Sequence, residues 1–238
     1  MRVVLAIGGS VLAPDLDAER VAGYAAAVER LLDADCSVGA VVGGGTAARD
    51  YIETARRLGA NEVALDEFGI AVTRLNARLL IAALGEAAAP TPAEAYDEAA
   101  AAFRRGDVAV MGGLVAGQTT DAVGAGLAEY VDADLLVYAT SVPGVYDADP
   151  DDDPDATKYD ELAASDLVSL IADMEMDAGS NAPVDLLAAK IVQRSGIRTI
   201  VLDGDDPDAV EHAVRTGEHD GTDVVSADAN GAPAEWDE

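Results

Sequence analysis

Short apolar runs that stop at glycines alternate with amphipathic segments along this chain, and no other feature constrains its fold as strongly. The glycines stand directly after the apolar runs 2–7, 37–42 and 108–111, at Gly8-Gly9, Gly43-Gly44-Gly45 and Gly112-Gly113. Strand-length runs separated by helical segments are typical of parallel strands joined by helices. The sequence therefore predicts an α/β protein with a mainly parallel central sheet.

Apolar residues at helical spacing predict the helices that join these strands. The expected helices cover residues 17–32, 46–58, 70–84, 92–104, 119–130, 183–195 and 207–216. Thr46 is expected to cap the second of them, and Pro92 fits the first turn of the fourth, where proline is tolerated. Further strands are expected at 135–139 and 199–202, with a short last strand at Val224-Val225 and a loop rich in Pro, Gly and Asp at 142–155.

The length of 238 residues fits a single domain with a continuous core. From residue 227 the composition becomes small, polar and acidic, which predicts a frayed tail to residue 238. No uninterrupted hydrophobic run approaches about 18 residues, and Met1 leads directly into a strand pattern, so neither a membrane span nor a signal peptide is expected. The single cysteine, Cys36, excludes an internal disulfide and lies far from any histidine, which argues against a zinc site. We expect a cytoplasmic protein.

Acidic residues dominate the charge: 45 Asp and Glu face 15 Lys and Arg, which gives a net charge of −30. A surface of this sign repels phosphate backbones and anionic membranes, which excludes general nucleic-acid binding. Only two basic residues are lysines, Lys158 and Lys190. This composition resembles that of proteins from halophiles that keep molar salt in the cytoplasm. Dense carboxylates hold hydrated cations and keep such proteins soluble. We expect salt-dependent folding, with an ordinary acidic protein of a low-salt organism as the alternative.

The three glycine turns favour a phosphate-rich ligand. Glycine at a strand–helix turn lets backbone N–H groups approach an anion, and the following helix N-terminus adds a favourable potential. Parallel strands place their carboxyl ends on one edge of the sheet, where open α/β sheets bind ligands. Residues 3–13 and 37–48 contain no carboxylate, so this edge is expected to be neutral or positive.

Gly43, Gly45 and Ala48 also fit the dinucleotide-binding pattern G-x-G-x-x-A, with Asp66 as its ribose partner. A dehydrogenase is disfavoured, because the pattern follows the second strand instead of the first and the only histidines, His212 and His219, lie near the end of the chain. The lysine spacing of a P-loop is absent as well.

Several segments in order carry a family resemblance. They are IGGSVL (7–12), VVGGGTAARDYI (41–52), DEFGIAVTRLNARLLIAAL (66–84), VMGGLVAGQTTDAVGAGLAE (110–129), ADLLVYATSVPGVYDADPDDDPDA (133–156) and AGSNAPVDLLAAKIVQRSGIRTIVLDG (178–204). Together they resemble the amino acid kinase family, and within it the archaeal type of uridylate (UMP) kinases, from Met1 to about Val225. The segment GGxxxGQTTDAV separates nucleoside-monophosphate acceptors from the amino-acid acceptors of sister enzymes.

The resemblance implies a three-layer α/β/α sandwich over residues 1–226, with an acceptor-binding half to about residue 130 and an ATP-binding half from about residue 131. It implies transfer of the γ-phosphoryl group of ATP to UMP, giving UDP and ADP for pyrimidine biosynthesis, without a covalent intermediate and with Mg²⁺ accompanying ATP. It also implies a homohexamer built as a trimer of dimers.

The resemblance assigns residues to both nucleotides. ATP phosphates are placed on Gly9, Ser10, Gly45 and Arg49, and the adenosine against Thr140, Tyr146 and Asp149. UMP is placed on Gly44, on Asp66 through the ribose hydroxyls, and on Leu114, Val115, Ala116, Gly117, Gln118, Thr119 and Thr120, whose threonines would donate hydroxyls. Arg49 and Asp185 are the catalytic candidates: Arg49 would neutralise phosphate charge, and Asp185 would orient catalytic groups. No protein ligand to a metal is implied.

Each of these residues also has an interpretation without function. Arg49 fits a surface ion pair, Asp66 a helix N-cap, and Tyr146 a loop anchor. Asp185 fits an acid stabilised by a helix N-terminus, and Lys190 fits a solvated helix position. Their joint placement on the ligand edge of one sheet favours the functional interpretation.

One position departs from the family pattern. Many amino acid kinases carry a lysine two residues before the first glycine pair, where it reaches the transferring phosphate, and here that residue is Ala6. The charge would then be balanced by backbone N–H groups, Mg²⁺ and Arg49. Two alternatives remain: another acceptor on the same fold, such as isopentenyl phosphate or acetylglutamate, and a nucleotide-binding regulator without catalysis.

Overall fold

The computed structural model describes residues 1–148, 150, 153, 155–174, 184–226, 233 and 236. The described residues form a seven-stranded sheet of order β3-β2-β1-β4-β6-β7-β5. The strands are β1 (Arg2–Ile7), β2 (Ser37–Val42), β3 (Ala109–Met111), β4 (Leu135–Thr140), β5 (Glu161–Ala163), β6 (Arg198–Asp203) and β7 (Thr222–Val225). All neighbours pair in parallel except β6 and β7. The predicted mainly parallel sheet is confirmed.

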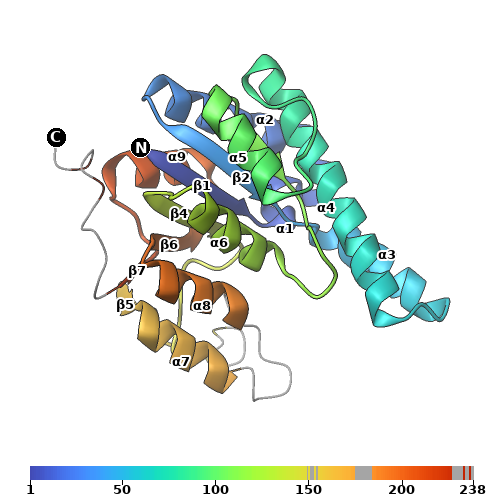
Figure 1. Ribbon diagram of the computed structural model, residues 1–238. Coiled ribbons are helices and arrows are strands. Elements are labelled where there is room, and N and C mark those ends of the chain that lie inside the picture. The colour runs from blue at the N-terminus through green and yellow to red at the C-terminus, as the bar shows by residue number, and fades with distance from the viewer. Residues whose placement is uncertain are drawn as a thin grey trace.

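Helices cover both faces of this sheet, as Figure 1 shows. They are α1 (Gly9–Leu12), α2 (Ala18–Asp33), α3 (Gly45–Arg57), α4 (Glu62–Leu84), α5 (Tyr96–Arg105), α6 (Thr120–Tyr130), α7 (Ala164–Met174), α8 (Leu186–Ser195) and α9 (Pro207–Thr216), with short 3₁₀ turns at Pro14–Leu16 and Gly85–Ala87. Side chains alternate across β1, so Leu5 belongs to the core that includes residues of α2, α4 and α9, whereas Val4 belongs to the core that includes residues of α5, α6, α7 and α8. The predicted α/β/α sandwich is confirmed.

The strand ends position the glycine turns. Ile7 of β1 pairs with Val42 of β2 on one side and with Ala139 of β4 on the other. The Gly43 N–H donates to the Ile7 carbonyl and the Gly8 N–H to the Ala139 carbonyl, each at 2.9 Å. The chain adds β2 and β3 on one side of β1 before it returns to place β4 on the other side. The turns after β1 and β2 therefore lie at the topological switch point, where sheets of this kind bind ligands.

The starts of α3, α4 and α5 differ from the predicted ones. Helix α4 begins at Glu62 instead of residue 70, because the Asn61 side chain caps it by accepting from the Ala64 N–H at 3.0 Å. Helix α5 begins at Tyr96, because the Ala93 N–H donates to the Val110 carbonyl at 2.8 Å and holds residue 93 beside β3, so the placement of Pro92 in a helical turn is wrong. The cap of α3 is Gly44 instead of Thr46.

The C-terminal part adds elements that were not predicted, β5 and α7, between the loop after β4 and residue 174. Helix α8 begins at Leu186 with Asp185 as its N-cap, and Pro183 lies outside the described residues. Of residues 227–238, predicted to form a frayed tail, the structure describes Pro233 and Trp236. The indole N–H of Trp236 donates to the Val214 carbonyl at 2.7 Å, so the chain is held at this point.

Among the described residues, one stretch that includes α4, residues 62–87, is long and apolar enough to cross a membrane by length and composition alone. Core helices of soluble proteins pass the same test. One side of α4 packs on α2 and the sheet through Ala77 and Leu80, which are fully buried. A second side exposes Phe68, Leu75 and Leu79.

Candidate functional site

The first two glycine turns pack backbone against backbone. A Cβ atom on Gly9 would lie 2.2 Å from the Gly45 nitrogen and 2.4 Å from the Gly43 oxygen. A Cβ atom on Gly45 would lie 2.5 Å from the Gly9 carbonyl carbon, and its φ of +62° also favours glycine. No side chain fits at either position. The structure thus brings together the two turns that were predicted to hold phosphates.

These turns present backbone donors at the sheet edge. Gly9 and Ser10 are the first residues of α1, and Gly45 is the first residue of α3. The first N–H groups of a helix have no acceptor within the helix, and they favour an anion. The Gly8 and Gly43 N–H groups already donate to neighbouring strands. The donors left for phosphates therefore include those of the predicted residues Gly9, Ser10, Gly44 and Gly45.

Arg49 lies on α3, one turn beyond these donors, and its side chain is exposed. On the same helix, Arg56 and Arg57 both pair with Glu53. Within the described part of the chain Arg49 forms no ion pair. Its guanidinium group therefore keeps its five N–H donors for another anion, as the predicted role requires.

The loop from Leu114 to Thr120 joins β3 to α6 and lies beside the start of α4. The Gly117 N–H donates to Oδ2 of Asp66 at 2.8 Å, and Gly117 has a φ of +82°. Leu114 packs against the core, whereas the side chain of Val115 is exposed. The structure brings Asp66 and the loop together and leaves the second carboxylate oxygen, Oδ1, for a further donor.

Asp185 connects α8 to this loop. One of its carboxylate oxygens caps α8 by accepting from the Ala188 N–H at 2.9 Å, and the other accepts a hydrogen bond from the Thr119 hydroxyl. Thr119 in turn caps α6 by accepting from the Ala122 N–H at 3.1 Å. The hydroxyl proton of Thr119 is therefore engaged by Asp185, so of the two threonines predicted to donate hydroxyls, Thr120 is the one left to do so.

Asp121 belongs to this cluster although it is absent from the predicted site. Desolvation by burial and, to a smaller extent, the nearby charge of Asp185 outweigh a hydrogen bond from the Asp185 backbone and together raise the pKa of its carboxyl group to about 7. Tyr138, at the base of the cluster, donates its hydroxyl to the Asp121 carbonyl at 3.0 Å. The signal in the sequence was an acid directly after two threonines at a helix start. Such a raised pKa is typical of functional sites.

The residues predicted to hold adenosine lie at the end of β4 and in the loop that follows. The Thr140 hydroxyl donates to the Val142 carbonyl at 2.9 Å and accepts from the Val142 N–H at 3.1 Å, which turns the chain away from the sheet. Tyr146 is half-buried, and its backbone forms an isolated antiparallel β-bridge with Lys158. Asp149 lies outside the described residues.

Ala6, which stands where many amino acid kinases have lysine, is buried in β1 against α6. A Cβ atom on Gly124 of α6 would lie 2.9 Å from the Ala6 Cβ atom. The space over residue 6 is filled by a helix backbone, and a longer side chain there would displace α6.

Two cavities lie near the carboxyl edge. One of about 400 Å³ borders the loop from Leu114 to Thr120, which we call the acceptor loop after its predicted ligand. This cavity is lined by Gly117, Thr119, Ala122, Asp185, Leu186, Leu187 and Lys190. The other, of about 970 Å³, lies between β6, α9 and the segment before β7, and several of its lining side chains are acidic. Of the predicted site residues that the structure describes, none lines the larger cavity. Its carboxylates would repel phosphate groups.

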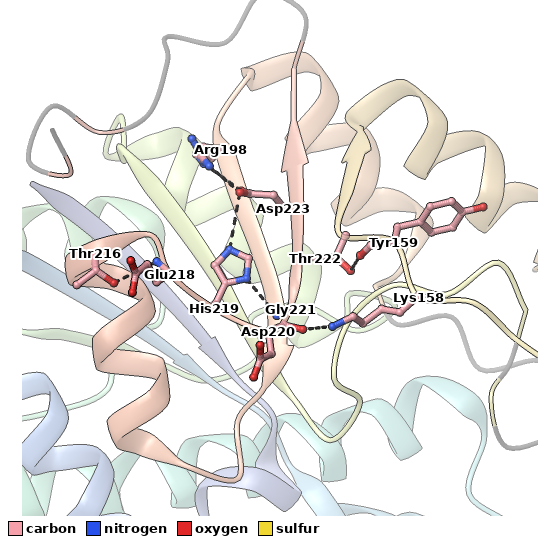
Figure 2. Close-up of polar contacts among 10 residues, drawn as sticks. All are labelled: Lys158, Tyr159, Arg198, Thr216, Glu218, His219, Asp220, Gly221, Thr222 and Asp223. Atoms are coloured by element: carbon pink, nitrogen blue, oxygen red, sulfur yellow. Dashed lines mark hydrogen bonds and ion pairs between the residues drawn. The ribbon is translucent and has the colours of Figure 1, made fainter.

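Figure 2 shows polar contacts beside this acid-lined cavity. Asp223 accepts two hydrogen bonds from Arg198, at 3.0 and 2.6 Å, and lies 3.7 Å from Nε2 of His219. Burial alone would raise the pKa of the Asp223 carboxyl group, but the bonds from His219 and Arg198 outweigh it and lower the pKa. Nδ1 of His219 accepts from the Gly221 N–H at 3.1 Å. These contacts tie β7 to β6.

Comparisons with known proteins match this geometry. Residues 1–203 match the Amino acid kinase family. The chain is 66% identical over 236 residues to a uridylate kinase of Halobacterium salinarum, covering 99% of this chain and 98% of that protein. It is 68% identical over 225 residues to a uridylate kinase of Haloarcula marismortui, covering 94% and 99%. It resembles the crystal structure of uridylate kinase from Archaeoglobus fulgidus with a TM-score of 0.85 and 44% identity, covering 94% of this chain and 100% of that one.

Proposed function

The chain belongs to the amino acid kinase family, and from this membership we propose that it is a UMP kinase, which transfers the γ-phosphoryl group of ATP to UMP to give UDP and ADP. The near full-length match to proteins named uridylate kinase carries the proposal, because it spans both the glycine turns and the acceptor loop. We also propose a place in pyrimidine nucleotide biosynthesis and in the cytoplasm. The haloarchaeal relatives support the halophilic character predicted from the composition.

The proposed mechanism needs no covalent intermediate. Phosphoryl transfer depends mainly on positioning and on neutralising charge on the phosphoryl oxygens. The N–H groups of Gly9, Ser10 and Gly45 would hold the ATP phosphates, and Arg49 would balance the charge that a lysine balances in other members of the family. The free Oδ1 of Asp66 would accept from the UMP ribose while Oδ2 keeps Gly117 in place.

Mg²⁺ is proposed to accompany ATP. No group of three or more His, Cys, Asp or Glu side chains among the described residues is arranged to hold a metal ion. Mg²⁺ usually binds through phosphates, water and only one or two carboxylates. We propose that the ion arrives on the nucleotide, where it would neutralise charge on the phosphates.

An assay of ADP release and UDP formation in molar KCl tests the function, with UMP, CMP, AMP and isopentenyl phosphate offered in parallel. We expect turnover with UMP. Turnover with isopentenyl phosphate alone would assign a different acceptor, and ATP binding without release of ADP would indicate a regulator.

We propose that the enzyme is a homohexamer, a trimer of dimers, as the family resemblance implies. The exposed side of α4 carries Phe68, Leu75 and Leu79 at helical spacing, with exposed fractions of 42%, 59% and 41%. Figure 1 shows α3 and α4 side by side at one end of the molecule. Exposed apolar side chains gathered on one side of a helix are typical of a contact surface. Light scattering in molar KCl is expected to give a hexamer for the wild type and smaller species for Leu75→Glu, whereas a wild-type monomer would contradict the proposal.

A further inference from the structure

Two polar side chains are buried on the side of α4 that faces the glycine turns. Thr73 and Asn76 are 6% and 3% exposed, and they lie one helical turn apart among apolar neighbours. Burying a hydroxyl or an amide is unfavourable unless its hydrogen bonds are satisfied. Both side chains form some of their hydrogen bonds with the backbone of the glycine turns. They therefore hold that backbone in a fixed position relative to α4.

Asn76 sets the direction of the turn at Gly43–Gly45, which we call the phosphate turn. Its Nδ2 donates to the Gly43 carbonyl at 2.9 Å and to the Gly44 carbonyl at 3.3 Å. In a planar trans peptide, the carbonyl of one residue and the N–H of the next point in opposite directions. Because both carbonyls point toward α4, the N–H groups of Gly44 and Gly45 point away from it. These are the two residues expected to meet the phosphates of UMP and ATP.

Thr73 sets the start of the acceptor loop in the same way. Its Oγ1 accepts from the Gly113 N–H at 2.7 Å and donates to the Ile70 carbonyl at 2.7 Å. A Cβ atom on Gly112 would lie 2.6 Å from this oxygen, so the glycine turn lies flat against the helix. The neighbouring Arg74 donates from Nε to the Gly113 carbonyl at 3.3 Å. Both polar groups of Gly113 are thus held by α4, directly before Leu114.

Thr73 also touches the phosphate turn, because its Cγ2 lies 3.5 Å from the position of a Cβ atom on Gly44. One turn of α4 therefore contacts both the segment that ends β2 and the segment that ends β3. A shift of this turn would change the spacing between the phosphate turn and the acceptor loop. In-line transfer is sensitive to such a displacement even when no substrate contact is lost.

We propose that Thr73 and Asn76 are positioning residues that fix the phosphate turn at Gly43–Gly45 and the acceptor loop at Gly113 to one rigid turn of α4. The inference rests on the proposed function, since it holds that the spacing between the phosphate turn and the acceptor loop sets the distance between ATP and UMP. Neither side chain is placed in contact with a substrate.

The pair Thr73→Val and Thr73→Ser tests this inference. Valine keeps the shape and removes the oxygen that Gly113 needs, whereas serine keeps the oxygen. Thr54→Val is a matched control, because the Thr54 hydroxyl also donates to a helix carbonyl, that of Asp50 at 2.8 Å, but on the exposed side of α3. We expect kcat/KM for UMP to fall by about tenfold or more in Thr73→Val, about 1.4 kcal/mol, and to be retained in Thr73→Ser and Thr54→Val. Equal values for Thr73→Val and Thr73→Ser would overturn the role of the hydroxyl.

Asn76→Ala and amide hydrogen exchange supply a readout that does not depend on catalysis. We expect faster exchange at Gly43 in Asn76→Ala, because its N–H bond to the Ile7 carbonyl lies in the turn that loses its anchor, and at Gly113 in Thr73→Val, because its N–H loses the Thr73 oxygen. We expect weaker UMP binding by calorimetry in both variants. Unchanged exchange and affinity in folded variants would contradict the inference. If the wild type binds UMP but does not phosphorylate it, the proposed function fails while the exchange measurement still tests the positioning role.

Discussion

Arg49 differs from the other arginines of α3 because it keeps its charge free of carboxylates within the described residues. In a chain with a net charge of −30, an exposed arginine has many acidic competitors for its guanidinium group. Arg56 and Arg57 both form ion pairs with Glu53. Arg49 stands instead one turn from the backbone donors of Gly45, beside segments without carboxylates. This placement supports the proposed role of Arg49 in binding phosphate.

Replacing Arg49 with alanine is expected to lower turnover at least about a hundredfold, roughly 3 kcal/mol of transition-state stabilisation. The reason is that no lysine at position 6 shares the task. Steady-state kinetics with ATP and UMP measures the effect. Arg104→Ala is the control, since it removes the same charge from an exposed position on α5. Near-normal activity of Arg49→Ala would refute the role.

Asp121 should make stability depend on pH in a defined direction. Its pKa is about 7 in the folded protein and near 3.8 in an unfolded chain, so between these values the folded state holds a proton that the unfolded state has lost. The free energy of unfolding should then fall with rising pH by about 1.4 kcal/mol per pH unit, relative to Asp121→Asn, and level off above pH 7.

Thermal melting of the wild type and Asp121→Asn at pH 5 to 8 in molar KCl, read as the difference between the two, measures this slope. Asn keeps the shape of the side chain and cannot titrate, so it cancels the many other carboxylates. Parallel melting temperatures across the pH range would contradict a raised pKa at Asp121.

Single residues were predictable where the sequence carries the reason locally. Gly9 and Gly45 could be recognised because glycines clustered at strand ends signal a close backbone approach. Thr73 and Asn76 could not, because their partners at Gly113 and Gly43 lie far away in the chain and the same letters fit any amphipathic helix. The roles of the predicted substrate residues stay predictions until ligands are bound.

Among the elements, α4 shows how a local signal can be hidden by another. The predicted helix began at residue 70, after Gly69, whereas the helix begins at Glu62 with Asn61 as its cap, so Gly69 lies inside it. The first turns of α4 bring Asp66 to the acceptor loop. The correct boundary therefore matters for the site as well as for the fold.

Removal of the Asn61 cap is expected to destabilise the protein by about 1 kcal/mol. Asn61→Ala loses the oxygen that accepts from Ala64, while Asn61→Asp keeps it and adds a charge favourable at a helix N-terminus. Melting curves in molar KCl should place Asn61→Ala below the wild type and Asn61→Asp at or above it. Equal melting of the alanine and aspartate variants would show that the cap has no effect.

Contacts between segments distant in the chain determine where some elements begin, and these boundaries could not be predicted from local sequence patterns. Pro92 is a good residue for a first helical turn, but the backbone of Ala93 is drawn to β3 before α5 can begin. β5 escaped prediction because it has three residues, and α7 follows it directly. Strands β1, β2 and β4 were predictable because each is a continuous apolar run buried on both faces.

The charge of the whole molecule is distributed unevenly. The segments that form the first two glycine turns contain no carboxylate, whereas acids line the cavity beside α9. Arg20 and Arg30 neutralise only part of the acidic turn around Asp205 and Asp208. The remaining repulsion is screened over a distance that shrinks as salt rises.

Folding is therefore expected to require salt, with a melting temperature that rises steeply between dilute buffer and molar KCl. Circular dichroism at a series of KCl concentrations measures it, and sucrose in dilute buffer is the control for effects that do not involve charge. A protein that melts at the same temperature in dilute buffer and in molar KCl would disprove the expectation.

Trp236 gives such experiments a built-in probe. It is the only tryptophan of the chain, its indole N–H donates to the Val214 carbonyl, and the Arg198 guanidinium group lies 4.7 Å from its ring centre. Its fluorescence reports one contact between the last residues of the chain and the α9 side of the sheet, whereas circular dichroism averages over all helices. If the two signals change at different salt concentrations, the C-terminal end is released from the domain in a step separate from the loss of the fold.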